Sequence, residues 1–97
     1  MENGPTPVKS NLGKKEIIFS NHAKTKMSDR GASEDEVRKA IDEGSSEPAR
    51  KGHLKFRKNF PFSAMWRGKH YSVKQVAPVV SEDNDGLVVI TVYVYYF

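Results

Sequence analysis

Three histidines and a row of lysines and arginines are the residues in this chain that could act on an anionic substrate. His22, Lys26 and Arg30 recur every four residues, so on a helix they would form a stripe within about 80° of arc. Such a stripe offers hydrogen-bond donors to a phosphate or carboxylate, and His22 could donate a proton. The same spacing also fits a solvated basic helix face on which His22 is a structural hydrogen-bonding group.

A second candidate is the segment 48–81, which contains no aspartate or glutamate although the chain has 12 acidic residues and a net charge of +4. Its aromatic residues alternate with its cations, a mixture typical of single-stranded nucleic-acid binding, where cations contact phosphates and exposed rings stack on bases. Alternatively, the rings fill the core and the cations only solubilise the surface. Phe62 and Trp66 are the rings expected to reach solvent. The basic residues are Arg50, Lys51, His53, Lys55, Arg57, Lys58, Arg67, Lys69, His70 and Lys74.

The histidines favour metal-free chemistry over a metal site. A metal would need a converging carboxylate or a third ligand, and no acidic residue accompanies His53 or His70, so we expect no metal and no cofactor. Two histidines beside cations permit RNA cleavage, in which one takes the 2′-hydroxyl proton and the other protonates the leaving oxygen. His22 and His70 are the candidate catalytic residues. The candidate RNA- or phosphate-binding residues are Lys26, Arg30, His53, Lys55, Arg57, Trp66 and Lys74.

Two helices are expected to position the first stripe. The first spans about 21–30, with Ser20 or Asn21 as its N-cap and Gly31 as its left-handed end. The second begins at a capping box, Ser33 to Glu36, and ends at Gly44. Their expected buried residues are Ala23 and Met27 in the first helix, and Val37, Ala40 and Ile41 in the second.

Strands are expected to follow, because the hydrophobic period changes to two after residue 44. The expected strands cover about 46–51, 53–60, 71–81 and 87–97, with an aromatic connection at 59–69 and a hairpin loop at 82–86. Pro78 predicts a bulge or an edge position. Residues 16–19 are expected to be an extended entry segment. The last strand is apolar on both faces and is therefore expected to be central.

The alternation within 71–81 predicts which basic residues share the open sheet face. If Val73, Ala77 and Val79 face the helices, Lys74 lies on the open face. His53, Lys55 and Arg57 of the preceding strand would join it there, and a register slip of one residue would reverse this assignment. At the end of the chain, Tyr93, Tyr95, Tyr96 and Phe97 form either a stacking surface or the packed end of a central strand.

Length and composition bound the remaining classes. The 97 residues fit one domain, and the segment 1–14, which has no apolar period, is expected to be a disordered tail. The absence of cysteine excludes disulfides, thiolate zinc sites and a cysteine nucleophile. No apolar run reaches the roughly 18 residues that span a bilayer, and no signal-peptide core opens the chain. A cytoplasmic protein without a membrane partner is therefore expected.

The segment His22-Ala23, Lys26-Met27 and Arg30-Gly31, followed by the capped second helix, resembles a known motif. It is similar to the H-A-x-x-R-M-x-x-R-G-I-S-x-x-x-V opening of uncharacterised bacterial and archaeal domains distantly allied to RelE/ParE-like toxins. The segment 86–93 is similar to the closing strand of that family. The resemblance implies a single α+β RelE-like domain over 15–97, with two short N-terminal helices on one face of a three- to four-stranded antiparallel sheet. Lys26 and Ala32 depart from the motif, and Lys26 loses the planar fork with which arginine binds phosphate.

These observations favour a small RelE-like domain that binds RNA, free or within a ribosome, through a basic sheet face. Metal-free endoribonuclease activity is the catalytic extension that the resemblance to toxins implies. The alternative is a non-enzymatic module that binds an acidic partner such as an antitoxin-like protein. A toxin relative without surviving activity is a third interpretation.

Overall fold

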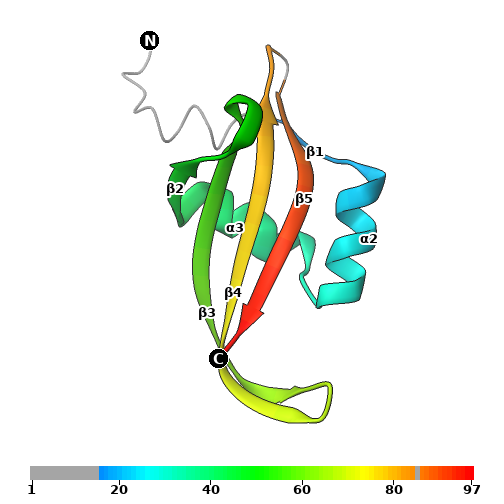
Figure 1. Ribbon diagram of the computed structural model, residues 1–97, viewed down its shortest axis with the longest axis vertical. Helices are drawn as coiled ribbons and strands as arrows, with labels where there is room; N and C mark the ends of the chain where they lie inside the picture. The colour runs from blue at the N-terminus through cyan, green and yellow to red at the C-terminus, as the bar shows by residue number, and fades with distance from the viewer. Residues whose placement is uncertain (1–15, 85) are drawn as a thin grey trace.

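The computed structural model describes residues 16–84 and 86–97 and shows two helices on one face of a five-stranded sheet (Figure 1). The strand order is β1-β5-β4-β3-β2. In chain order the elements are β1 (Glu16–Phe19), α2 (Asn21–Arg30), α3 (Glu34–Glu43), β2 (Ser45–Pro48), the 3₁₀ turn η1 (Arg50–Gly52), β3 (Leu54–Trp66), β4 (Lys69–Glu82) and β5 (Gly86–Tyr96). The tail predicted over 1–14 lies outside the described residues.

The predicted helix-first fold with a three- to four-stranded antiparallel sheet is wrong. The segment expected to be an extended entry is strand β1, which precedes both helices and pairs in parallel with β5. The sheet is therefore mixed and has five strands. A four-residue strand is too short to show the period of two, and its partner lies about 70 residues away, so no local pattern reveals the pairing. Ile17 and Phe19 pack against the core and fix β1 in place.

Both helices are as predicted. Ser20 caps α2, where its hydroxyl accepts a hydrogen bond from the Ala23 amide at 3.0 Å, and Gly31 ends it with φ 83°. Ser33 and Glu36 form the predicted capping box of α3. The expected helix residues are buried, which confirms that both apolar stripes face the sheet: Ala23, Met27, Val37, Ala40 and Ile41.

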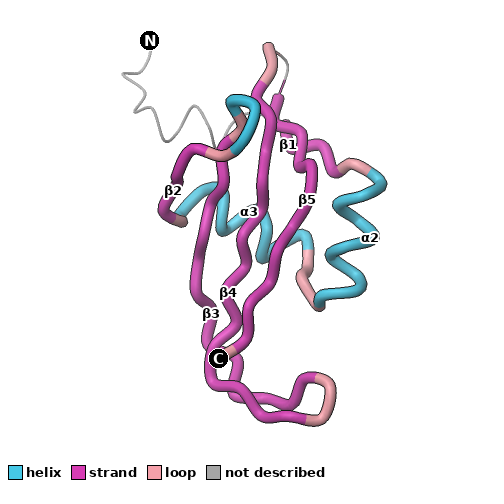
Figure 2. Tube along the Cα trace, viewed as in Figure 1, coloured by secondary structure: helices cyan, strands magenta, loops and turns pink. Residues whose placement is uncertain are grey.

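The aromatic connection predicted at 59–69 is instead part of a long β3–β4 hairpin, which curls beyond the C-terminus (Figure 2). Pro61 does not break the ladder and pairs with Val73. β2 pairs with β3 only as far as Arg57, so Pro61 lies on an exposed edge of the sheet. Proline is tolerated there because no further strand needs a hydrogen bond from its missing N–H. Pro78 is buried in the central strand β4, and the bulge that it predicts falls one residue later, between Val79 and Val80.

The two faces of β4 are the reverse of those predicted. Val76 and Val80 belong to the core under the helices, so Ala77 and Val79 point to the open face. Lys74 points to the helices, where it meets Glu36 in the first turn of α3. The alternation misled because both faces of β4 carry valines. Glu36 of α3 decides which face Lys74 occupies, and this ion pair cannot be recognised from the sequence of β4 alone.

Candidate nucleic-acid interface

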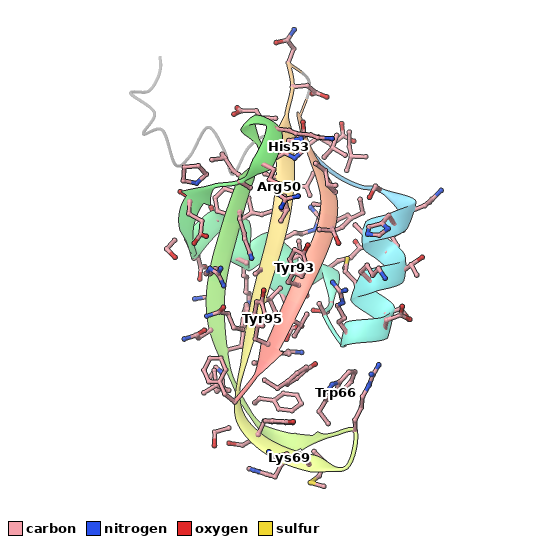
Figure 3. All side chains as sticks on the ribbon, viewed as in Figure 1. Arg50, His53, Trp66, Lys69, Tyr93 and Tyr95 are labelled. Carbon is pink, nitrogen blue, oxygen red and sulfur yellow. The ribbon has the colours of Figure 1, made fainter. Side chains whose placement is uncertain are left out.

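The open sheet face carries basic and aromatic side chains from β3 and β5. Lys55 and Arg57 flank the buried Phe56 in β3, so alternation directs them away from the helices. Tyr93 and Tyr95 lie between residues of β5 that face the core, so they point the same way. Figure 3 shows both tyrosines along the sheet, with Arg50 and His53 toward one end. We call Arg50, His53, Lys55, Arg57, Tyr93 and Tyr95 the open-face cluster.

Cations approach the two exposed rings of the open-face cluster from several directions. Lys55 Nζ lies 4.8 Å from the centroid of the Tyr93 ring and 5.8 Å from that of Tyr95. The guanidinium of Arg57 lies 5.8 Å from the Tyr95 ring, and that of Arg30, from α2, lies 5.2 Å from Tyr93. Both tyrosines are 39% exposed. The rings therefore hold the cations at the surface by cation–π attraction while keeping area open to solvent.

Arg57 is held by polar neighbours, in contrast to Lys55. Its Nε donates to Glu47 at 3.1 Å and its NH1 donates to Gln75 at 3.0 Å. The hydrogen bond and charge of Arg57 lower the pKa of Glu47, and the hydrogen bond to Glu47 raises the pKa of Arg57. Within the described part of the chain, Lys55 forms no ion pair. Lys55 is therefore the more available cation at the centre of the face.

One end of the open-face cluster is hollowed. The hollow measures about 500 Å³. The η1 turn walls it and is fixed by two backbone bonds, from the Ala49 amide to the His53 carbonyl at 2.8 Å and from the His53 amide to the Arg50 carbonyl at 3.0 Å. Lys51 adopts a positive φ of 59° within this turn. The residues around the hollow are Pro48, Ala49, Arg50, His53, Lys55, Val79, Thr91 and Tyr93.

The Arg-Gly end of the helical motif has a structural role. Its last three carbonyls each accept a hydrogen bond from a side chain of β4, of β5 or of the turn between β3 and β4, which satisfies groups that a helix end leaves unpaired. The Arg30 guanidinium also reaches β5, where NH1 donates to the Val92 carbonyl at 3.0 Å. The three bonds to the carbonyls come from Arg67 to Asp29 at 2.7 Å, from the Tyr96 hydroxyl to Arg30 at 2.7 Å, and from Lys74 to Gly31 at 2.8 Å.

Lys74 and Trp66, both predicted to contact RNA, are occupied in this helix–sheet junction. Lys74 is only 8% exposed, and its Nζ lies 2.9 Å from Glu36 Oε2. Trp66 stacks on Tyr96 with ring centroids 5.0 Å apart and an interplanar angle of 16°. A Cβ at Gly31 would lie 2.9 Å from the Trp66 ring, so the positive φ and the close packing both require glycine there. Burial among these groups raises the pKa of Tyr96.

The structure does not bring the two candidate catalytic histidines together. His22 lies in the first turn of α2, which follows β1 beside Val89 of β5. His70 lies in the curled hairpin, beyond the point where Val73 bonds to Phe97. The extended chain from Val89 to Phe97, at about 3.3 Å per residue, already spans about 26 Å. General acid and base must both reach one phosphodiester, so this pair is separated too widely to share one.

Of the predicted site residues, the structure gathers His53, Lys55 and Arg57 on the open face, with the Arg30 guanidinium at its margin. It places His22, Lys26 and His70 elsewhere. Sequence reasoning missed Arg50 and Thr91 as site residues and left the closing tyrosines undecided. The signal for Tyr93 and Tyr95 was their alternation with Val92 and Val94, which separates them from Tyr96 on the helix side.

No group of three or more histidine, cysteine or acidic residues in 16–84 and 86–97 could hold a metal ion. Across the same residues, neither helix is long and apolar enough to cross a membrane. The described part of the chain is thus a small domain in which two helices cover one face of a mixed sheet and a basic, aromatic surface occupies the other.

Residues 19–94 match the family described as Domain of unknown function (DUF4258). The match covers most of the chain, and the protein belongs to this family. No curated protein and no solved structure matches the chain. The kinship with RelE/ParE-like toxins that the helical motif suggested stays a prediction.

Proposed function

We propose that this domain binds single-stranded RNA on its open sheet face. The observation that supports this is the placement of Lys55 between the exposed rings of Tyr93 and Tyr95, with Arg57 beside them. Single strands are bound by cations that follow the backbone and by rings on which bases stack. The open-face cluster offers both within one surface, on the side of the sheet that the helices leave uncovered (Figure 1).

The charges of the face favour an anionic ligand over an apolar one. Lys55 and Arg50 can neutralise phosphates directly, whereas Arg57 must first exchange part of its contact with Glu47. Each neutralised phosphate of a single strand contributes about 0.7 to the slope of log K against log salt. A base stacked on Tyr93 or Tyr95 would add about 1–3 kcal/mol. Affinity is therefore expected to depend strongly on salt and on ring identity, and only weakly on sequence.

Binding, rather than cleavage, is what we propose. His53 is the histidine of the open-face cluster, and His22 and His70 lie at other places in the fold. The helical motif lends no support to catalysis, because Arg30 and Gly31 bond to the sheet. An RNA incubated with the protein at low salt is expected to be retained and to stay intact.

The decisive test is fluorescence anisotropy with a 12-nucleotide RNA of mixed sequence at 50 mM salt. Tyr93→Ala is expected to weaken binding about tenfold, because a stacking platform is removed. Tyr93→Phe keeps the ring and is expected to bind within about twofold of the parent, in line with the sequence tolerance of stacking. If the folded parent binds no RNA, or if Tyr93→Ala binds as tightly as Tyr93→Phe, the proposal is refuted.

An acidic protein segment would bind the same cations. The salt dependence and stoichiometry of binding distinguish such a protein from RNA. A protein partner predicts one tight stoichiometric complex, weaker dependence on salt and little response to the length of a competing RNA. Retention of RNA that strengthens with length and falls steeply with salt supports the RNA assignment. If the domain binds no RNA but forms a stoichiometric complex with an acidic peptide, the RNA assignment is wrong.

A further inference from the structure

The hollow at the end of the open-face cluster differs from the rest of the face in shape. Tyr95, Tyr93 and His53 follow one another along the sheet toward the η1 turn (Figure 3). The turn stands beside the sheet as a wall, together with Pro48 and Ala49. Its backbone bonds fix it, so the wall is a built feature of the site. A strand of RNA that follows the tyrosines in this direction would therefore reach the hollow beside this turn.

The lining of the hollow gathers positive charge without a balancing acid. Arg50, His53 and Lys55 approach it from the turn and from β3, and Thr91 adds a hydroxyl from β5. No aspartate or glutamate is among its lining residues. Glu47, the acid of β2, is bonded to Arg57. The charge of the hollow therefore suits a group with more than one negative charge.

Size and chemistry together indicate the ligand class. A volume of about 500 Å³ falls in the range of about 300–1,000 Å³ that small-molecule sites occupy. It exceeds what a lone phosphate needs, and the exposed Tyr93 ring beside the cations offers a stacking surface for a base. A phosphomonoester carries about −1.5 to −2 charges at pH 7, compared with −1 for an internal phosphodiester.

We propose that the hollow binds a nucleoside monophosphate unit, with the base on Tyr93 and the phosphomonoester on Arg50, His53 and Lys55. This inference rests on the proposed function and narrows it, because it makes the open face a reader of phosphorylated RNA ends. The same unit occurs as a free nucleotide or as the last residue of a phosphorylated strand. Thr91 can donate to the phosphate or accept from the base edge.

The test compares one 8-nucleotide RNA in three forms: with a 5′-phosphate, with a 3′-phosphate and with neither. The second charge of a terminal phosphate is expected to add about one to two contacts with cations, each worth about fivefold in affinity at 0.1 M salt. An RNA with a phosphorylated end is therefore expected to bind about tenfold more tightly than the unphosphorylated RNA. Arg50→Gln is expected to abolish this preference, and it weakens the unphosphorylated strand by only the one phosphate contact of Arg50, about fivefold. Lys69→Gln, at the far end of the β3–β4 hairpin (Figure 3), is the matched control and is expected to keep it.

The outcomes separate this inference from the proposed function. Equal binding of all three RNAs, or an end preference that survives Arg50→Gln, overturns the end-binding site while RNA binding stands. Failure of every RNA to bind the folded protein overturns both. Competition by free nucleoside monophosphate at the affinity of the phosphorylated strand supports the site with the free nucleotide as its source. Competition only by phosphorylated strands supports the site with RNA ends as its source. Arg50 is exposed, so the variant is expected to fold.

Discussion

Replacing Lys55 by glutamine tests whether the open face, rather than the overall charge, binds RNA. Lys55 lies between the two exposed rings and forms no ion pair within the described residues, so its loss removes a cation from the centre of the cluster. Lys39 is exposed on α3, which lies on the opposite side of the sheet. Lys39→Gln is therefore a matched control, because both substitutions lower the net charge of +4 by one unit.

The size of the effect follows from counterion release. One phosphate contact to a single strand contributes about 0.7 to the salt slope, which corresponds to about fivefold in affinity between 1 M and 0.1 M salt. Arg50 and Lys55 contribute one contact each, whereas Arg57 is held by Glu47, so the parent is expected to have a slope of about −1.4. Lys55→Gln is therefore expected to bind about fivefold more weakly at 0.1 M salt, with a slope of about −0.7.

Fluorescence anisotropy of a labelled 12-nucleotide RNA, titrated at four salt concentrations between 50 and 200 mM, measures both quantities. Lys39→Gln is expected to keep the slope of the parent and to lose less than twofold in affinity. Equal losses in the two variants would refute the reasoning, because the RNA would then be responding to net charge and not to the position of Lys55. An unchanged slope in Lys55→Gln would remove this residue from the interface.

Three further predictions concern the ion pairs and the helix–sheet junction. Glu47→Gln releases Arg57 and is expected to tighten RNA binding about fivefold at 0.1 M salt in the same anisotropy assay. The control is Glu43→Gln, which removes an acid paired with Lys58 and is expected to change RNA binding less than twofold. Lys74→Met leaves Glu36 without its partner and is expected to lower the free energy of unfolding by about 2–3 kcal/mol in urea titrations; an unchanged midpoint would contradict the structural role of the pair. Tyr96→Phe removes a hydrogen bond and is expected to cost about 1 kcal/mol at pH 7. Folding raises the Tyr96 pKa above its ordinary value of 10.0, so this stabilisation is present below pH 10 and declines as the pH rises through the folded-state pKa. Urea midpoints of parent and variant should therefore converge as the pH is raised above 10, and a constant gap would argue against the titration of Tyr96.

The helices could be predicted from sequence because their signals are local. Ser20, Gly31 and the Ser33–Glu36 capping box each act within a few residues, and the structure has both helices at the predicted bounds. β1 could not be predicted, since its pairing with β5 joins distant segments and its four residues show no period. Pro61 misled in the opposite direction, because its effect on the ladder depends on whether another strand lies beside it.

The candidate site was predicted in part for a related reason. Lys55 and Arg57 alternate with Phe56, which is a clear core residue, so their face was readable from β3 alone. Lys74 was misassigned, because the acid that makes its burial favourable belongs to α3. The hollow depends on the η1 turn, in which Lys51 takes a positive φ. The residues that precede the turn do not indicate it, so the hollow could not be predicted.

The helical motif illustrates how a basic stripe can be structural. Arg30 looks like a phosphate ligand by residue type and spacing, yet its guanidinium donates to the Val92 carbonyl of β5. The carbonyl of the neighbouring Gly31 accepts from Lys74 of β4. Tyr96 closes the same junction through its hydroxyl. The motif therefore specifies how α2 docks on the sheet, and the functional hypothesis rests on the opposite face.

The most direct test of RNA binding by the open face is a map of backbone amide chemical shifts during titration with a short single-stranded RNA. If the open face binds RNA, the largest changes cluster at Lys55, Arg57, Tyr93 and Tyr95 and fade when salt is raised to 200 mM. Amides of the exposed side of α3, around Lys39, should stay unchanged. Changes that cluster on α2 around His22, with none in β3 or β5, would show that RNA does not bind the open face.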